Sequence, residues 1–596
     1  MLVEKRSFSP VSWFRSTDLF RWMLLGGLLL IAIPTHAFQA TSEGARVFPK
    51  GASVYVEISH PEDVIELVVG HPLRTQIAEL GPVQLGLNSP QMKMVRLGLS
   101  FLQLRIGEDL LPAVKKLTRG GIYLGVDVDK QAVGLAFKSS DPDLLKKTAG
   151  EILGFVRQQG GENVYQIKTY RDGKLALMKG LVLARYGNWF LLANQESYIR
   201  SMADNLVESE KVSTPSKTSL ASSTPFLEAA KHRNGQSAIW TFVDLASVRK
   251  MPNTNPLFQG TTDNPAVELL FGGVLEGLEN ARFLGAGLQL DDMSVRLSLS
   301  LPFSQKGIRE SREFYFGNQA MGQAPPSVEV PGVMGQVTTY RDLGRWWLAK
   351  EDLFSEKVIA NLSLAESQLS TFFGNADFGE EILGALQPGL RLVVKPQEYK
   401  EGVDPDIKLP AFALIGRLQN PQRETRFRIS FNSFITLLNL SENGSMPQFD
   451  VQTMKEQGYR VTSAQYLIDD AEDTGLIHYN FSPSIAFQDD YMILASTEDL
   501  ACELAAATKA WDPEATSASN SLLSVSISEL KKQLNLNRES LIAQSMVENN
   551  KSREVATEEI DILFAIMDFA NRAVIDYQVK DREMTLDITL DLNHGH

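Results

Sequence analysis

The chain has 596 residues, of which 43% are hydrophobic and 22% are charged, and it carries a formal net charge of −14 with one cysteine, Cys502. This composition excludes a fibrous or disordered chain and predicts a globular protein with a packed core. The negative charge argues against nucleic acid and anionic membrane surfaces as partners, and a single cysteine excludes an intrachain disulfide.

The N-terminal segment 1–37 is predicted to be a secretory signal peptide. Its apolar run, Trp22 to Ile33, has 12 residues. That is too short for a membrane-spanning helix of roughly 20 residues. Thr35-His36-Ala37 then offers the small residues that signal peptidase prefers. We expect cleavage after Ala37 and a secreted or periplasmic protein, whose charge becomes −16 because four basic and two acidic residues are removed. The alternative is a protein tethered to the membrane by an uncleaved segment.

The first large lobe, 47–206, is predicted to be an antiparallel sheet with helices packed on one face. Apolar residues alternate on both sides of Asp129-Lys130, which predicts a hairpin. Asp141-Pro142 has the cap and first-turn residues of a helix. Further hairpins are expected at Asp172-Gly173 and Gly187-Asn188. Such short turns join antiparallel strands, so the pattern indicates the α+β class and disfavours Rossmann and barrel folds.

A small lobe, 221–303, follows a Ser/Thr-rich stretch at 213–224. It is predicted to contain a strand from Ala238 to Asp244, a helix and a closing strand pair. The apolar residues of that helix recur at helical spacing and form one stripe, at Val267, Leu270, Phe271 and Val274. Residues 295–301 alternate with period two, as a strand with one apolar face does.

The pattern of the first copy recurs loosely in a second. IGEDLLPAVKKLTRGGIYLGVD (106–127) is matched by FGEEILGALQPGLRLVVKP (378–396), and LARYGNWFLLANQESY (183–198) by IAFQDDYMILASTEDL (485–500). The helix stripe recurs at Ile560, Leu563, Phe564 and Met567, before a strand at 584–592. We therefore predict a tandemly duplicated unit, whose second copy has a large lobe at 333–508 and a small lobe at 521–593, after a linker at 304–332.

Five stretches carry a family resemblance: PKGASVYVEI, GGIYLGVD, LAFKSSDPDLL, GNWFLLAN and AIWTFVDL. In this order, after a signal peptide, they resemble a group of large secreted bacterial proteins catalogued only as a domain of unknown function. The resemblance covers most of the chain after residue 37. It implies a periplasmic or surface setting, and it brings no known activity and no catalytic residues.

The sequence predicts no catalytic, cofactor-binding or metal-binding residue. The histidines after residue 37 form neither a metalloprotease motif nor a zinc-ligand cluster; they are His60, His71, His232, His478, His594 and His596. His60 precedes Pro61, which indicates a turn or cap, and the last two histidines indicate a frayed end. Cys502 in DLACELAAA is predicted to be a small buried hydrophobic residue rather than a reactive thiol.

Acidic and glycine pairs also favour structural roles. Glu108-Asp109 and Glu380-Glu381 are predicted to open helices, where negative charge complements the dipole. Adjacent helical residues point about 100° apart, so neither pair suits a glycosidase. The acids of DAEDTGLI (470–477) alternate as in a calcium loop, but Phe481 stands where the bidentate Glu is needed, which favours an acidic turn. Gly272-Gly273 lies in a periodic helix and indicates close packing rather than a phosphate cradle.

The leading interpretation is a non-enzymatic secreted or periplasmic binding or structural protein of the bacterial envelope. We expect no cofactor, an unidentified envelope or extracellular partner, and no integral membrane domain after signal cleavage. The alternative is a hydrolase whose active site is assembled from scattered residues without a local motif.

Two connections are longer in the second copy than in the first, at 396–408 and 439–448. Loops tolerate insertions at small cost and carry binding residues more often than the scaffold does. Any partner contact specific to the second copy is therefore expected there. On this view, replacing Gln397 to Ile407 with Asn-Gly leaves thermal stability nearly unchanged and weakens partner capture. The alternative is a neutral polar insertion with no role.

Overall fold

The computed structural model describes residues 42–593 apart from short internal gaps. The gaps are 71–73, 80–82, 85, 87, 162, 213, 234, 236, 252–259, 292, 319–321, 400–404, 442–448, 457, 467–476 and 581. The predicted signal peptide, His71, His594, His596 and most of the predicted acidic turn therefore lie outside the described residues.

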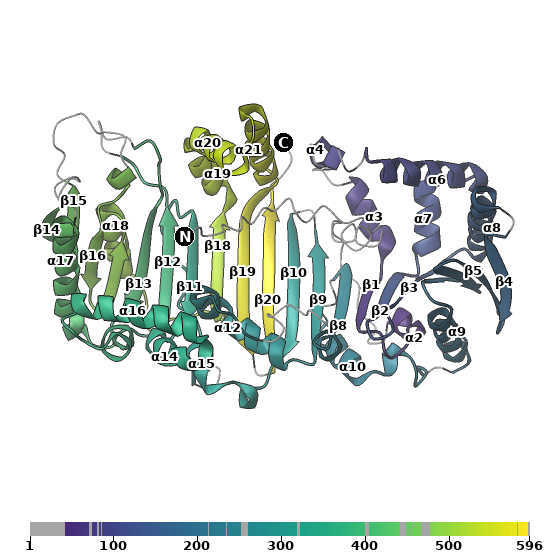
Figure 1. Ribbon diagram of the computed structural model, residues 1–596, viewed down its shortest axis with the longest axis horizontal. Helices are drawn as coiled ribbons and strands as arrows, with labels where there is room; N and C mark the ends of the chain where they lie inside the picture. Colours follow the sequence, from purple (N-terminus) through teal and green to yellow (C-terminus); the bar gives the residue numbers. More distant parts are fainter. Residues whose placement is uncertain are drawn as a thin grey trace, which may run out of the picture.

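The described strands form one antiparallel sheet of 20 strands that runs through both halves of the chain (Figure 1). The first half contributes β1 (Val54–Ile58), β2 (Ile122–Asp127), β3 (Ala132–Lys138), β4 (Tyr165–Tyr170), β5 (Gly173–Met178), β6 (Leu181–Tyr186), β7 (Trp189–Ala193), β8 (Ile239–Asp244), β9 (Phe283–Leu290) and β10 (Ser294–Pro302). The second half contributes β11 (Gly335–Tyr340), β12 (Gly389–Lys395), β13 (Ala411–Arg417), β14 (Phe449–Glu456), β15 (Tyr459–Tyr466), β16 (Ser484–Gln488), β17 (Tyr491–Ala495), β18 (Ser521–Ser526), β19 (Ala570–Lys580) and β20 (Glu583–Leu592).

Strand pairing gives both halves the same order. Outward from the centre, the first half runs β10-β9-β8-β1-β2-β3-β7-β6-β5-β4. The second half runs β20-β19-β18-β11-β12-β13-β17-β16-β15-β14. β10 pairs with β20 and joins the two series. A tandem duplication requires the same strand order in both halves, and it stays a prediction.

Helices of very different length accompany the sheet. Those before the middle of the chain are α2 (Glu43–Val47), α3 (Pro61–Gly70), α4 (Arg74–Glu79), α6 (Pro90–Ile106), α7 (Leu110–Thr118), α8 (Pro142–Gly160), α9 (Glu196–Lys211), α10 (Thr224–Lys231), α11 (Leu245–Val248) and α12 (Pro265–Asn280). The others are α13 (Glu313–Phe316), α14 (Leu343–Leu348), α15 (Lys350–Leu353), α16 (Glu356–Phe372), α17 (Glu424–Ser441), α18 (Glu498–Thr508), α19 (Ile527–Leu536), α20 (Arg538–Asn549) and α21 (Arg553–Met567).

The predicted α+β class with an antiparallel sheet is confirmed, and helices cover both faces of its outer strands. In β5, Leu175 packs in a core with α2, α9 and α10, while its neighbour Ala176 packs in a second core with α6, α7 and α8. Successive strand residues point to opposite faces. The expectation of helices on one face is therefore too simple at β5–β7, because these strands are apolar on both sides and each side needs a cover.

The predicted helix cap and turns are confirmed, except that one turn lies one residue earlier than predicted. Asp141 caps α8, since its carboxylate accepts from the Leu144 N–H at 2.9 Å. The β2–β3 hairpin encloses Asp129-Lys130, and Gly187 has a positive φ of 54° in the β6–β7 turn. The β4–β5 turn is one residue earlier than predicted, because Arg171 takes the positive φ of 51° and Gly173 already pairs with Tyr170.

The predicted linker 304–332 contributes to the core between the halves. Its helix α13 carries Phe314, Tyr315 and Phe316, which are all buried. The Tyr315 ring lies against α12, where a Cβ on Gly273 would stand 2.2 Å from Cε1 of that ring. Gly273 therefore permits the close approach of the linker to the helix, as the sequence predicts for this glycine pair.

Gly273→Ala is expected to lower the free energy of unfolding by about 1–3 kcal/mol, the usual cost of overpacking a core. The Tyr315 ring is buried and must move away from the new methyl group. Urea denaturation followed by tryptophan fluorescence measures the change. The control is Gly150→Ala in α8, where nothing lies within 4 Å of the new Cβ and where helix propensity predicts a stabilisation of about 0.5–1 kcal/mol. Equal effects of the two substitutions would contradict the packing argument.

The long connection between β12 and β13 is anchored where the structure describes it. The Gln397 side-chain amide donates to the carbonyl oxygens of Leu409 at 2.7 Å and Asn480 at 3.1 Å, and the Tyr399 hydroxyl donates to the Asn480 side chain at 2.7 Å. Further along, the Lys408 N–H donates to the Asn537 side chain at 2.8 Å, which ties the connection to the start of α20. The two described ends of this connection are therefore tied to the surrounding structure by hydrogen bonds.

Replacing Gln397 to Ile407 with Asn-Gly is now expected to lower the free energy of unfolding by about 2–4 kcal/mol, since several hydrogen bonds worth about 0.5–1.5 kcal/mol each are lost. Differential scanning calorimetry checks this. Glu398→Ala is the control, because that side chain is exposed within the same connection. An unchanged melting temperature of the loop replacement would restore the view of a neutral insertion.

Candidate ligand-binding surface

The four central strands, β9, β10, β20 and β19, present one apolar side. Because strand residues alternate between faces, the residues of this side are set by the register. They are named here the apolar face: Ala286, Leu288, Leu290, Val295, Leu297, Leu299, Leu301, Met584, Leu586, Ile588, Leu590, Ala573, Ile575, Tyr577 and Val579.

Cross-strand pairing makes this face continuous. Leu297 stands opposite Leu288 on one side and Ile588 on the other. Ile588 in turn stands opposite Ile575. Directly opposed side chains lie about 4.5–5.5 Å apart at Cβ and contact each other. The result is a continuous apolar surface across the four strands, made of aliphatic side chains and the Tyr577 ring.

The other side of the same strands is polar. Ser298 follows Leu297 in β10 and stands opposite Asp587 of β20. Asp587 in turn stands opposite Asp576 of β19. Arg296 likewise stands opposite Thr589. The centre of the sheet is thus two-sided, with one apolar and one hydrophilic surface, as antiparallel sheets commonly are.

Helix α12 covers only the lower end of the apolar face as drawn in Figure 1. There Leu301, Met584 and Tyr577 are buried, and a Cβ on Gly277 would lie 2.8 Å from the Met584 sulfur. Further up, Leu297 and Ile588 are only half-buried. Helices α19, α20 and α21 lie at the upper end of these strands in the figure. Between the two ends, apolar side chains remain accessible.

On the same side of the sheet, accessible apolar residues continue beyond β19 to β12, β13 and β17. Leu392 on β12 is opposite Leu414 on β13, which is opposite Leu494 on β17. Leu392, Phe412 and Leu494 are exposed by 39%, 48% and 37%. Each Å² of apolar surface left in water forgoes about 25 cal/mol of stabilisation, and contiguous apolar patches on soluble proteins commonly mark interaction sites.

The buried side of α12 carries two charged residues, and two of its apolar residues face outward. Arg312, next to α13, donates to Glu268 at 2.7 Å and to Glu276 at 2.9 Å, and all three side chains are buried. Burial alone would lower the pKa of Arg312, but the hydrogen bonds and charges of both carboxylates outweigh it and raise that pKa. Leu270 and Phe271 are exposed instead.

The predicted apolar stripe of α12 is divided, because Val274 packs against the core while Leu270 and Phe271 are exposed. The buried residues of α12 are Glu268, Gly272, Gly273, Leu275, Glu276 and Gly277, and the charge cluster and the glycines bring the helix close to α13. The corresponding stripe of α21 is also divided, with Phe564 buried and Leu563 exposed.

Arg341, at the end of β11, fixes α12 from the second half. Its guanidinium is fully buried and donates to neutral acceptors, the carbonyl oxygens of Leu269 and Leu270 and the side chain of Asn520. It also lies 3.4 Å from the ring centroid of Tyr315. Burial lowers the pKa of Arg341. A buried cation without a carboxylate partner needs a hydrogen-bond acceptor for each of its N–H groups. Because Leu269 and Leu270 of α12 supply two of these acceptors, the hydrogen bonds of Arg341 fix the position of α12.

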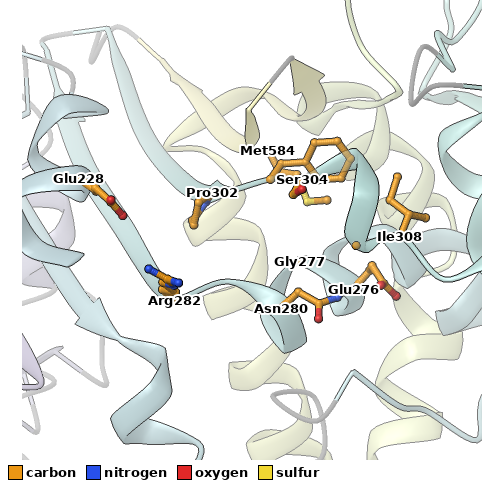
Figure 2. A pocket seen from close by; sticks show the side chains of 11 residues that line it. Glu228, Glu276, Gly277, Asn280, Arg282, Pro302, Ser304, Ile308 and Met584 are labelled. Atoms are coloured by element: carbon orange, nitrogen blue, oxygen red, sulfur yellow. Dashed lines mark hydrogen bonds between the residues drawn. The ribbon is translucent and has the colours of Figure 1, made fainter. Parts of the chain in front are cut away.

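A pocket of about 390 Å³ lies beside the last turn of α12 (Figure 2). It is lined by Glu228, Glu276, Gly277, Asn280, Arg282, Pro302, Phe303, Ser304, Gly307, Ile308 and Met584. Figure 2 shows Glu228 and Arg282 at one end and Glu276, Asn280 and Ile308 at the other, with Met584 between them. Met584 belongs to the apolar face as well, so the pocket adjoins that face at its lower end.

A second, smaller pocket of about 100 Å³ lies beside the β12–β13 connection. Its lining includes Gln397, Tyr399, Tyr466, Tyr479 and Asp499. The predicted association of this connection with binding stays a prediction.

Comparison of the sequence with protein-family models and with curated proteins finds no match. Among solved structures, crystal form III of TP0453 is similar over 49% of this chain and 91% of that chain, at 10% identity and a TM-score of 0.25. Crystal form I of TP0453 covers 49% and 90%, at 13% identity and a TM-score of 0.24. This is a distant structural likeness, and scores this low carry no argument. The resemblance to secreted proteins of unknown function stays a prediction.

The histidines considered from the sequence lie in three separate places. His60 ends the chain segment before α3, where its carbonyl oxygen accepts from the Val64 N–H. His232 follows α10, with Nδ1 3.2 Å from Glu583. His478 is buried among aromatic rings. The described residues contain no group of three or more His, Cys, Asp or Glu side chains placed to hold a metal ion.

The cysteine and the acidic pairs occupy structural positions. Cys502 is half-buried on α18 and packs against the core of β13, β16 and β17. Asp109 is the N-cap residue of α7, and Glu108 pairs with Lys116 at 2.9 Å. Glu380 and Glu381 lie in the short π-helix Phe378–Ile382, and Glu381 pairs with Arg426 at 2.6 Å.

Sequence reasoning missed the apolar face as a site. The signal was present in the period-two pattern of 295–301 and 584–592, which predicts one apolar side but not whether a helix covers it. No sequence pattern indicated Glu228 and Arg282 as pocket residues, because they are 54 positions apart and are brought to one pocket only by the fold.

Proposed function

We propose that this chain is a non-enzymatic binding protein of the bacterial envelope, secreted or periplasmic, that holds the acyl chain of a lipid or fatty acid on its apolar face. The observation that carries the proposal is the continuous apolar surface of β9, β10, β20 and β19, whose residues Leu297 and Ile588 are only half-buried beyond the part that α12 covers. Aliphatic side chains offer dispersion contacts and burial, and they supply no acid, base or nucleophile.

The dimensions of the apolar face suit an acyl chain. Neighbouring strands lie about 4.8 Å apart, so the four central strands are about 15 Å across. One leaflet of a bilayer is also about 15 Å deep in hydrocarbon, half of a core of about 30 Å. An extended chain can lie across these strands with most of its length in contact.

Binding at the membrane surface differs from insertion into it. Within the described ranges, every helix is too short or too polar to serve as a membrane span. The negative net charge opposes adsorption to anionic bilayers, so we propose that the ligand is a single amphiphile removed from or delivered to the envelope.

Titration of the purified protein with pyrene-labelled dodecanoic acid tests the proposal. We expect saturable binding, followed by pyrene fluorescence, and displacement by unlabelled palmitic acid. Organic extraction of protein purified from the periplasm should also yield bound lipid. Linear, non-saturable uptake of the probe, or failure of palmitic acid to displace it, would overturn the proposed function.

A further inference from the structure

The pocket beside α12 has two chemically different ends. Phe303, Ile308 and Met584 give it an apolar lining, and Glu228 and Arg282 stand at the end away from Ile308 (Figure 2). Its volume of about 390 Å³ falls within the range of small-molecule sites, about 300–1,000 Å³. A ligand that fits both ends has an apolar part and charged groups.

The two charged side chains at that end differ from the other charges around α12. Glu276 at the far end is engaged by Arg309, Arg312 and Asn280. For the side chains of Glu228 and Arg282, by contrast, the described residues provide no hydrogen bond or ion pair. Glu228 is half-buried on α10 and Arg282 is exposed just before β9. One carboxylate and one guanidinium are therefore left for a ligand.

These groups select a ligand that carries both signs of charge. A carboxylate attracts an ammonium group, and a guanidinium binds phosphate with paired, charge-assisted hydrogen bonds. Because the two charges cancel, the pocket favours neither a simple anion nor a simple cation. Met584 lines the pocket and also belongs to the apolar face, so the pocket adjoins the surface proposed for the hydrocarbon part of such a ligand.

We propose that this pocket holds a zwitterionic phosphate–ammonium head group, with the ammonium at Glu228 and the phosphate at Arg282. This inference rests on the proposed function, since the acyl chain of the same ligand lies on the apolar face. The pocket thereby selects zwitterionic phospholipids over free fatty acids.

The test compares two probes, 16-carbon lysophosphatidylethanolamine and palmitic acid, by displacement of pyrene-labelled dodecanoic acid. Glu228→Gln and Arg282→Gln should each weaken lysophosphatidylethanolamine binding at least fivefold and leave palmitic acid binding within twofold. Glu310→Gln and Lys250→Gln, which remove exposed charges outside the pocket, should change neither probe.

The outcomes separate the two proposals. If the wild-type protein binds palmitic acid but the pocket variants bind lysophosphatidylethanolamine as tightly as wild type, the head-group site is overturned and the acyl-binding function stands. Equal weakening of both probes by the pocket variants also overturns head-group selection. If the wild-type protein binds neither probe, the proposed function itself is overturned.

Discussion

Ile588→Asp is expected to lower the affinity for pyrene-labelled dodecanoic acid at least tenfold. Ile588 stands at the middle of the apolar face, opposite Leu297 on β10 and Ile575 on β19. A carboxylate at this position must either lose its water to a bound acyl chain or keep the chain away, and burying an unpaired charge is costly. A tenfold loss of affinity corresponds to about 1.4 kcal/mol of binding free energy, which is a small part of the cost of burying an unpaired charge. Fluorescence titration measures the change.

The matched control is Thr589→Asp, the same substitution one residue further along β20. Thr589 points to the polar side, opposite Arg296, where a carboxylate is compatible with the neighbouring charge. It should bind the probe within twofold of wild type. Since Ile588 is only half-buried, circular dichroism should show both variants folded. Equal affinities of the two variants would contradict an acyl site on the apolar face.

The sequence predicts local structure well and the central sheet poorly, for a physical reason. Asp141, Gly187 and the Asp129-Lys130 hairpin act through residues a few positions away, so their effects can be read from short patterns. The β10–β20 pair joins residues about 290 positions apart, and nothing local in either strand specifies its partner. The apolar face depends on that pairing, so only the structure reveals it.

Helix α12 shows a second limit of sequence patterns. Its stripe at Leu270 and Phe271 has the spacing of a core-facing helix, yet these residues are exposed. Periodicity assumes that the apolar side is the buried side. Here Glu268 and Glu276 are buried instead, because Arg312 from the connecting segment supplies the opposite charge. A buried ion cluster built from distant residues overrides the local pattern.

Arg312→Met is expected to lower the free energy of unfolding by about 3–5 kcal/mol, because removing one partner of a buried ion pair leaves an uncompensated charge. The Arg312 side chain is 2% exposed, and its loss leaves the buried Glu268 carboxylate without its cation and leaves Glu276 with the partly exposed Arg309. Since the cluster joins α12 to the segment between the halves, the first unfolding transition should shift most. Urea denaturation followed by tryptophan fluorescence measures it.

Arg309→Met provides the comparison, because Arg309 pairs with the same Glu276 from a side chain that is 40% exposed. Partly exposed ion pairs contribute about 0–1 kcal/mol, so this variant should lose far less. The triple variant Arg312→Met, Glu268→Gln, Glu276→Gln removes the charges together and should recover much of the loss. If Arg312→Met and Arg309→Met destabilise equally, α12 is held over Leu301 and Met584 by its glycine packing and not by the buried charges.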